Sequence, residues 1–268
     1  MNVKKTRIIL CAAVLLLFIG SLSIWIANAI SDYYSPETID PTNIGMQLDG
    51  RAGYISFLGD SITTFDGCSN STEYNSTIGK AAPYYNSSKM HVTSTWWYKM
   101  AEAADMRLCV NNSWSARRVT DTKPGITSGV AAASELDNDI DGIVPDAIVI
   151  YLGTNDVANG ISVSDFAVAY AEMLDIVKEC YPRAKLYCCT ILPESRTVGR
   201  EAEVAEYNKT IRNLAKIGGG VTLIDFASAM PDWDYTSECY RDSSTLQVHP
   251  TADGMARMAE VAISYLDD

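Results

Sequence analysis

An apolar run in the segment YISFLGDSITTFDG, residues 54–67, ends on Gly59, Asp60 and Ser61. These residue types are common in turns, so an ordinary turn is one interpretation of the segment. The other interpretation is chemical. A serine at the carboxyl end of a buried strand lies where open α/β sheets bind their ligands, and its hydroxyl becomes a nucleophile when a base lies beside it.

Polar residues of complementary chemistry occur near the ends of other apolar runs. The segment NNSWSA, residues 111–116, overlaps the end of one run, and GTND, residues 153–156, follows another. His249 precedes the last helical pattern. Each segment alone is typical of a turn or loop, but together they supply a base and hydrogen-bond donors. We therefore expect Ser61, Asn155 and His249 to meet at one edge of a sheet.

The elements that must position these residues alternate between strand-like and helical patterns. The expected strands are YISFL (54–58), RLCVN (107–111), AIVIYL (147–152), KLYCCTIL (185–192) and VTLIDF (221–226). The expected helices are TWWYKMAEAADM (95–106), DFAVAYAEMLDIVKEC (165–180), EVAEYNKTIRNLAKI (203–217) and ADGMARMAEVAISYL (252–266). Strands rich in Ile, Val and Leu are typical of parallel sheets covered on both faces. This alternation predicts a three-layer α/β/α sandwich around a mostly parallel, five-stranded sheet.

From Tyr54 to Leu266 the sequence resembles the SGNH hydrolases, also called GDSL-type esterases and lipases. The four blocks of this family occur in order, as GDSI (59–62), NNSWSA (111–116), GTND (153–156) and HP (249–250). Further likenesses are PDAIVIYLGTND, and AEYNKTI after ILPESR. Ordered motifs in the expected structural context are more specific than any one of them alone. The resemblance implies the flavodoxin-like fold of this family.

The resemblance also implies a role for each matching residue. Ser61 is the nucleophile and His249 is its base, because His91, the other histidine, lies in a polar loop and is expected at the surface or facing substrate. The oxyanion hole comprises the backbone N–H of Ser61, a backbone N–H in the second block, assigned to Ala116, and the side-chain amide of Asn155. Such donors can each contribute about 10²- to 10³-fold to the rate.

Two positions depart from the family pattern. Ala116 replaces the glycine that usually ends the second block, so its N–H is in place only if the position does not require a positive φ. Leu246 stands three residues before His249, where the family normally has an aspartate. We expect a Ser-His dyad in which a backbone carbonyl accepts the Nδ1 proton. Asp242 is the alternative acid, provided that the segment SSTLQV loops out.

The N-terminal 31 residues are expected to form a membrane anchor. Three basic residues precede a stretch that has no charge from Ile8 to Ser31. As a helix this stretch covers about 36 Å, enough for a bilayer core of about 30 Å. The basic flank predicts that the catalytic domain, residues 51–268, lies outside the cytoplasm after a linker at 32–50. Ala27-Asn28-Ala29 has the form of a cleavage site, but we favour an uncleaved anchor.

Composition limits the partners. The chain has 21 Lys and Arg against 33 Asp and Glu, a formal charge of −12, which argues against nucleic-acid binding and is typical of a soluble acidic surface. The seven cysteines match no zinc pattern, most are expected to be buried, and any disulfide pairing stays open. With two histidines, neither a metal nor a cofactor is expected. The oligomeric state stays open.

Three functions compete. We favour a serine esterase for short-chain, chiefly acetyl, esters on carbohydrate, since an anchored external domain meets glycans. A lipase or lysophospholipase is the second candidate, although the polar segment 64–93, with Tyr84 and Tyr85 as candidate groove residues, is unlike an apolar lid. A weakened binding relative is the third, suggested only by Leu246. The choice between hydrolysis and acyl transfer stays open.

Overall fold

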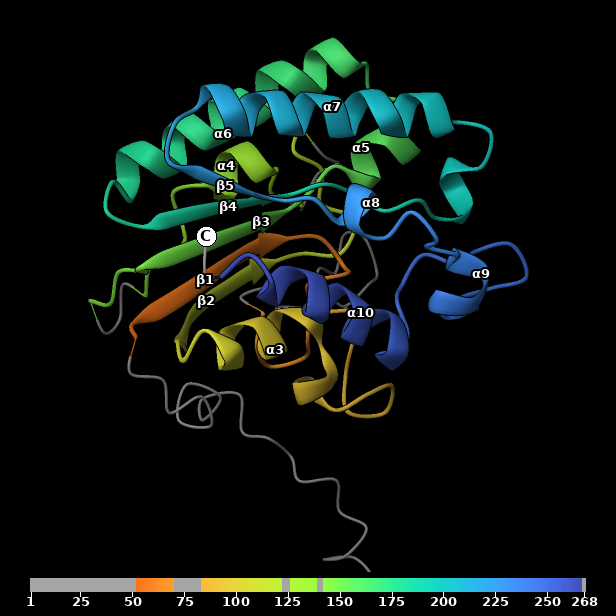
Figure 1. The fold of residues 1–268 in the computed structure, drawn as a ribbon, viewed down its shortest axis with the longest axis horizontal. Coiled ribbons are helices and arrows are strands. Elements are labelled where there is room, and N and C mark those ends of the chain that lie inside the picture. Colours follow the sequence, from red (N-terminus) through yellow and green to blue (C-terminus); the bar gives the residue numbers. More distant parts are fainter. Residues whose placement is uncertain (1–51, 70–82, 122–125, 139–141, 267–268) are drawn as a thin grey trace, which may run out of the picture. The chain divides into compact units, whose positions relative to one another are not determined.

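The computed structural model describes residues 52–69, 83–121, 126–138 and 142–266, and its centre is a five-stranded sheet (Figure 1). The strands are β1 (Tyr54–Gly59), β2 (Arg107–Ser113), β3 (Ala147–Tyr151), β4 (Lys185–Cys189) and β5 (Val221–Ile224). Every pair of neighbouring strands is parallel, and the strand order is β2-β1-β3-β4-β5. The expected strands and the five-stranded parallel sheet are confirmed.

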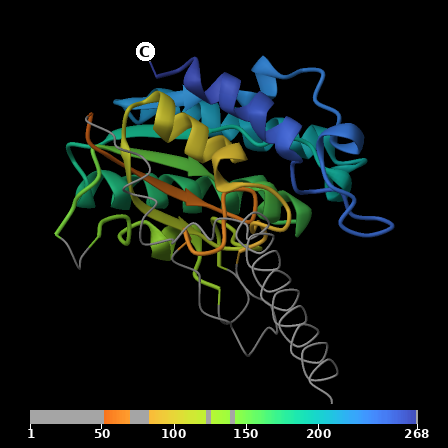
Figure 2. The same ribbon diagram turned by 90° about the horizontal axis from the view of Figure 1, so that it is seen from below.

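Helices cover both faces of the sheet (Figures 1 and 2). The helices on one face are α3 (Trp96–Ala103) and α10 (Ala252–Ile263). Those on the other are α4 (Gly129–Ala132), α5 (Thr154–Ala158), α6 (Val163–Cys180) and α7 (Glu201–Ile217). Short helices complete the described chain: η2 (Val92–Ser94), η3 (Ser195–Thr197), α8 (Phe226–Ala229) and α9 (Tyr235–Glu238). The three-layer arrangement is therefore the one that the alternation predicts.

Both faces of the central strands are buried, which explains why their sequences lack strict alternation. On one face Phe57 of β1 packs edge-on against Trp96 of α3, with ring centroids 5.9 Å apart. On the other, Leu58 and Ile150 belong to the apolar cluster that includes Phe166 of α6. Parallel strands covered on both sides are stabilised by burial of every side chain rather than of alternate ones.

The strand order indicates at which edge of the sheet a ligand would bind. The chain leaves β1 for β2 on one side and later builds β3 on the other. In sheets of this order, ligands bind outside the carboxyl ends of the strands where the direction of winding reverses. The three expected blocks that follow or end β1, β2 and β3 therefore converge on one edge.

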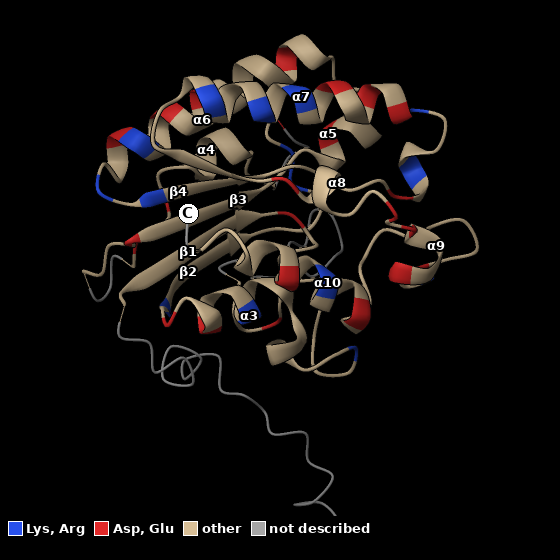
Figure 3. Ribbon diagram, in the orientation of Figure 1, with Lys and Arg blue, Asp and Glu red and all other residues tan. Residues whose placement is uncertain are grey.

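The expected membrane segment at 1–31 and the linker at 32–50 lie outside the described residues. Among the residues that are described, no helix has the length and hydropathy needed to cross a bilayer. Acidic and basic side chains are intermixed along α6 and α7 (Figure 3). The six cysteines within the described ranges are free thiols, four of them buried, which fits the expectation of small apolar residues: Cys68, Cys188, Cys189 and Cys239.

Candidate active site

Ser61 lies in a tight turn that begins directly after β1. The Ile62 N–H donates to the Asp60 carboxylate at 3.0 Å, and the Thr63 N–H donates to the Asp60 carbonyl at 3.0 Å. A Cβ atom on Gly59 would lie 2.6 Å from the Thr63 hydroxyl oxygen, so only glycine fits there. The turn is built from contacts within four residues, and the Ser61 side chain, 7% exposed, is held at its apex.

Ser61, His249 and Asp242 form a continuous hydrogen-bonded line. The His249 Nε2 atom lies 2.9 Å from Ser61 Oγ, and the His249 Nδ1 atom lies 2.9 Å from Asp242 Oδ2. This is the arrangement of a nucleophile, a base and an orienting acid. The expectation of a dyad with a backbone carbonyl on Nδ1 is wrong in its geometry, because a carboxylate occupies that place.

Asp242 reaches His249 because the residues between them loop out. The N–H groups of Asp242 and Ser243 donate to the Leu246 carbonyl at 2.8 and 3.2 Å, and the Leu246 N–H donates back to the Ser243 hydroxyl at 3.1 Å. The loop closes on itself, and the Leu246 side chain is 39% exposed. Four extra residues, 243–246, therefore separate Asp242 from the position that the family pattern gives the acid.

The charges of this line suit proton transfer. Although burial opposes its ionisation, hydrogen bonds from His249 and Tyr84 lower the pKa of Asp242 to about 2. Burial lowers the pKa of His249 below its usual value, and the neighbouring Asp242 opposes this effect. At neutral pH the acid is therefore ionised and the imidazole is neutral, the form that accepts a proton from a serine.

The second block supplies a backbone N–H in an unusual conformation. Ala116 has a φ of +66°, in the left-handed region that its family counterpart, a glycine, adopts without strain. For alanine this conformation costs about 1–2 kcal/mol. Among the described residues neither Ala116 nor Ser61 has an acceptor for its backbone N–H, so both donors are open to a ligand.

Asn155 lies beside the Ser61 turn, and its amide already makes hydrogen bonds. Its Nδ2 atom donates to the Arg117 carbonyl at 3.0 Å and to Asp60 Oδ2 at 3.3 Å. The second contact is longer than an ordinary hydrogen bond. Gly153 opens this block with a φ of +128°, which turns the chain from β3 into α5. An oxyanion bound here would accept the Asn155 N–H that now makes the longer contact with Asp60.

Asp156, the last residue of the same block, holds the second block in place. Its carboxylate accepts the Val119 N–H at 2.9 Å, the Thr120 N–H at 3.1 Å and the Thr120 hydroxyl at 2.8 Å. The chain after Ala116 is thereby fixed to the amino end of α5. The GTND block serves two purposes, since Asn155 contacts Asp60 in the Ser61 turn while Asp156 anchors the neighbouring loop.

Arg196 is a site residue that the sequence analysis did not single out. Its Nη1 atom donates to Asn155 Oδ1 at 3.1 Å, and its Nε atom pairs with Glu194 at 2.7 Å. The contact fixes the orientation of the Asn155 amide, because the oxygen must face Arg196 and the nitrogen must face Asp60. The available signal was its position within ILPESR, shortly after β4 and therefore at the same sheet edge.

Asp60 is a buried carboxyl in contact with this amide. Burial raises the pKa of Asp60 to about 7, although the Ile62 N–H and the charge of Arg196 oppose the increase. The carboxyl next to Ser61 is therefore harder to ionise than an exposed aspartate.

Of the other residues that the sequence analysis named, one lies at the site and the others lie elsewhere. His91 is exposed and its Nδ1 atom lies 2.7 Å from the Thr93 hydroxyl, as expected for a surface histidine. Tyr85 is fully buried, so it lines no groove. Tyr84 instead stacks on His249, with ring centroids 3.4 Å apart and an interplanar angle of 12°. Within the described ranges, no three His, Cys, Asp or Glu side chains are grouped as metal ligands would be.

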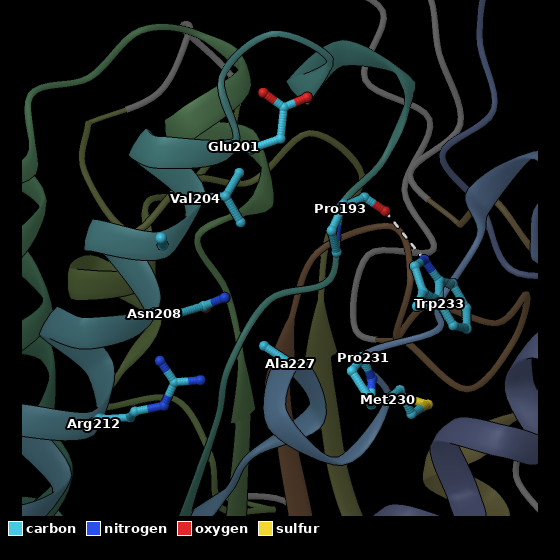
Figure 4. A pocket seen from close by; sticks show the side chains of 10 residues that line it. Pro193, Glu201, Val204, Asn208, Arg212, Ala227, Met230, Pro231 and Trp233 are labelled. Carbon is cyan, nitrogen blue, oxygen red and sulfur yellow. Dashed lines mark hydrogen bonds between the residues drawn. The ribbon is translucent and has the colours of Figure 1, made fainter.

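A pocket of about 240 Å³ lies away from this line, between α7 and the chain around α8 (Figure 4). Its polar side chains have partners inside the protein. Arg212 is paired with Asp225 at 2.7 Å, and Asn208 bonds both the N–H and the carbonyl of Ile191. The Trp233 indole donates to the Pro193 carbonyl at 3.1 Å. The pocket lining includes neither Ser61 nor His249.

Solved structures of similar fold include several esterases. A candidate GDSL-like lipase from Bacteroides ovatus has a TM-score of 0.58 at 23% identity, covering 80% of this chain and 98% of that one. Est24, a carbohydrate acetylesterase from Sinorhizobium meliloti, has a TM-score of 0.55 at 15% identity, with coverages of 80% and 98%. A family two carbohydrate esterase from Clostridium thermocellum has a TM-score of 0.53 at 20% identity, with coverages of 79% and 62%. At these identities the likeness shows the shared fold.

Comparison with curated proteins finds no match. The model of the GDSL-like Lipase/Acylhydrolase family, in contrast, matches residues 57–257, a span that contains Ser61, Asn155 and His249. The match covers well over half of the chain and includes every strand from β2 to β5. The chain therefore belongs to the GDSL-like lipase/acylhydrolase family.

Proposed function

We propose that this protein is a serine esterase that hydrolyses short-chain, chiefly acetyl, esters of carbohydrates. The observation that carries the proposal is the line from Ser61 through His249 to Asp242, with both contacts at 2.9 Å. A serine with a neutral imidazole on its hydroxyl and an ionised carboxylate behind the imidazole is equipped for acyl transfer.

The proposed reaction has two stages. Ser61 Oγ attacks the ester carbonyl while its proton passes to His249 Nε2, and the imidazolium is stabilised by Asp242. The oxyanion is bound by the N–H groups of Ser61 and Ala116 and by the Asn155 amide. His249 then protonates the leaving alcohol. In the second stage His249 Nε2 takes a proton from water as the water oxygen attacks the acyl carbonyl. The imidazolium then returns this proton to Ser61 Oγ as the acyl–oxygen bond breaks, which releases the acid and free Ser61.

Two lines of argument support a short acyl group on a carbohydrate. One similar structure is named a carbohydrate acetylesterase and another a carbohydrate esterase. Of the described side chains, those stacked on His249 are polar-tipped rather than aliphatic, with Tyr84 over the imidazole and Lys89 over Tyr84. A domain held outside the cell by residues 1–31, as the sequence predicts, would also meet glycans.

Acyl transfer to another acceptor is the second candidate. One similar structure, which this chain spans over 54% of its length, is named a salicylyl-acyltransferase, with a TM-score of 0.56 at 17% identity. The same acyl-serine serves both reactions, and the acceptor alone differs.

Labelling with a fluorophosphonate probe tests the proposal, together with hydrolysis of p-nitrophenyl esters from acetate to palmitate. We expect the full chain to be labelled and to prefer acetate. Ser61→Ala should lose labelling and at least about 10⁴-fold in kcat, whereas Ser164→Ala, at an exposed serine of α6, should retain both. Labelling that survives in Ser61→Ala contradicts the nucleophile assignment, and faster turnover of palmitate than of acetate favours a lipase.

A further inference from the structure

Tyr84 contacts both members of the pair that activates the nucleophile. Its hydroxyl donates to Asp242 Oδ1, and its ring stacks on His249 with centroids 3.4 Å apart. Asp242 Oδ2 meets His249 Nδ1 at 2.9 Å and the Val248 N–H at 3.2 Å. The two carboxylate oxygens therefore have different partners, and the one that faces away from the histidine is held by Tyr84.

The backbone of Tyr84 is attached to the nucleophile turn. Its N–H donates to the Thr64 hydroxyl at 2.9 Å, and that hydroxyl donates to the Ser61 carbonyl at 2.9 Å. One residue later, the Tyr85 carbonyl accepts the Asp66 N–H at 2.8 Å. The chain at Tyr84 and Tyr85 is thus tied by hydrogen bonds to the turn that carries Ser61.

Tyr85 makes a parallel connection to the histidine loop. It is fully buried, and its hydroxyl donates to the Pro250 carbonyl at 2.9 Å. Together the two tyrosines link the Ser61 turn, through their backbone, to the chain around His249, through their side chains. Ser61 and His249 lie 188 positions apart in the sequence, so the two tyrosines join segments that are distant along the chain.

We propose that Tyr84 is a positioning residue that holds Asp242 and His249 in register with Ser61 and shields one face of the imidazole from water. This inference rests on the proposed function and names the residue that aligns its base. Tyr84 touches neither Ser61 Oγ nor the reacting proton, so it acts through His249 and Asp242.

The arrangement predicts how His249 responds when Tyr84 changes. The charged groups near its imidazole are Asp242, Arg196 and Lys89, and burial is the main cause of its lowered pKa. Without the hydrogen bond from the Tyr84 hydroxyl, the Asp242 carboxylate stabilises the protonated imidazole more strongly, so the pKa of His249 rises. Removal of the whole ring also admits water and increases this rise.

Lys89 contacts Tyr84 as well. Its Nζ atom lies 4.2 Å from the Tyr84 ring centroid, and because His249 is stacked on one face, Lys89 must lie over the other. The Tyr240 hydroxyl donates to the Lys89 carbonyl at 3.0 Å. Tyr240 is therefore a neighbouring tyrosine with a hydroxyl bond of its own, which makes it a matched control.

The experiment is an NMR titration of the histidine ring protons, combined with steady-state kinetics on acetate ester. The chain has only two histidines, and His91→Gln assigns the signals. We expect Tyr84→Phe to raise the pKa of His249 slightly and to lower kcat about tenfold, with KM changed less than about threefold. Tyr84→Ala should raise this pKa by about 0.5 or more and lower kcat about 100-fold. Tyr240→Phe should match the wild type in both.

The titration separates this inference from the proposed function, because it needs no substrate. An unchanged His249 pKa and unchanged kcat in both Tyr84 variants, with circular dichroism like that of the wild type, would overturn the inference. If Tyr84→Ala does not fold, the Tyr84→Phe titration decides alone. The His249 pKa could shift in the Tyr84 variants while Ser61 of the wild type is not labelled by fluorophosphonate. This result would support the role of Tyr84 in positioning His249 and would contradict the proposed esterase activity.

Discussion

The two regions that meet at the candidate active site are built in different ways. The Ser61 turn depends on contacts close in sequence, such as the Ile62 N–H on Asp60 two residues before it. The His249 loop has local bonds within 242–246, but it depends in addition on partners far away in the sequence. Asp242 is held by Tyr84 across 158 positions, and the Gln247 N–H donates to the Ser195 hydroxyl across 52. The first region follows β1 directly, whereas the second needs side chains from distant parts of the chain.

This difference explains which changes each region tolerates. A turn fixed by local hydrogen bonds accepts few residue types, as the 2.6 Å approach at Gly59 shows. A loop fixed by side chains from elsewhere can change its length, provided that the functional group returns to the same place. The extra residues at 243–246 illustrate this, because they close on themselves at the Leu246 carbonyl.

The largest expected effect in the His249 loop comes from its acid. Asp242→Asn places an amide on His249 Nδ1 that favours the wrong imidazole tautomer, which in a serine-protease triad lowers turnover about 10⁴-fold. We expect a loss in kcat of about 10³-fold or more, measured on acetate ester with circular dichroism as a check of folding. Asp175→Asn, at an exposed site on α6, is the control and should change little.

A small effect of Asp242→Asn would instead support a Ser-His dyad. A loss of less than about tenfold in Asp242→Asn would mean that orientation of His249 does not depend on the carboxylate. The 2.9 Å contact would then be a structural bond between two loops rather than part of the catalytic line.

The second prediction tests whether the loop length matters. Deletion of residues 243–246 leaves Asp242 three residues before His249, the usual family spacing. Because the Asp242 N–H already bonds the Leu246 carbonyl at 2.8 Å, the new junction needs little movement. We expect kcat within about tenfold of the wild type. The same deletion combined with Asp242→Asn should be as slow as Asp242→Asn alone, and a slow single deletion would show that the loop itself positions the acid.

The features that could be predicted from the sequence are those that depend on residues close together in the chain. The five strands and the positions of Ser61 and Asn155 follow from apolar runs that end on polar turns. For the acid, the sequence offered Asp242 only as the alternative to a dyad, because its contact with His249 depends on a loop closed by Leu246 and on the distant Tyr84. A spacing rule places the acid at Leu246, and only the folded chain shows that four residues loop out.

The smallest expected effect concerns Ala116, which belongs to the locally built region but breaks its usual residue pattern. Its φ of +66° costs alanine about 1–2 kcal/mol, and the greater freedom of glycine in the unfolded chain offsets about half of that. Ala116→Gly should therefore raise the free energy of unfolding by about 0.5–1 kcal/mol, seen as a Tm higher by about 1–3 °C. Its kcat should stay within about twofold, because the N–H keeps its position. Ala171→Gly, within α6, is the control and should lower the Tm. An equal fall in both variants would show that Ala116 carries no strain and that the turn accepts alanine as readily as glycine.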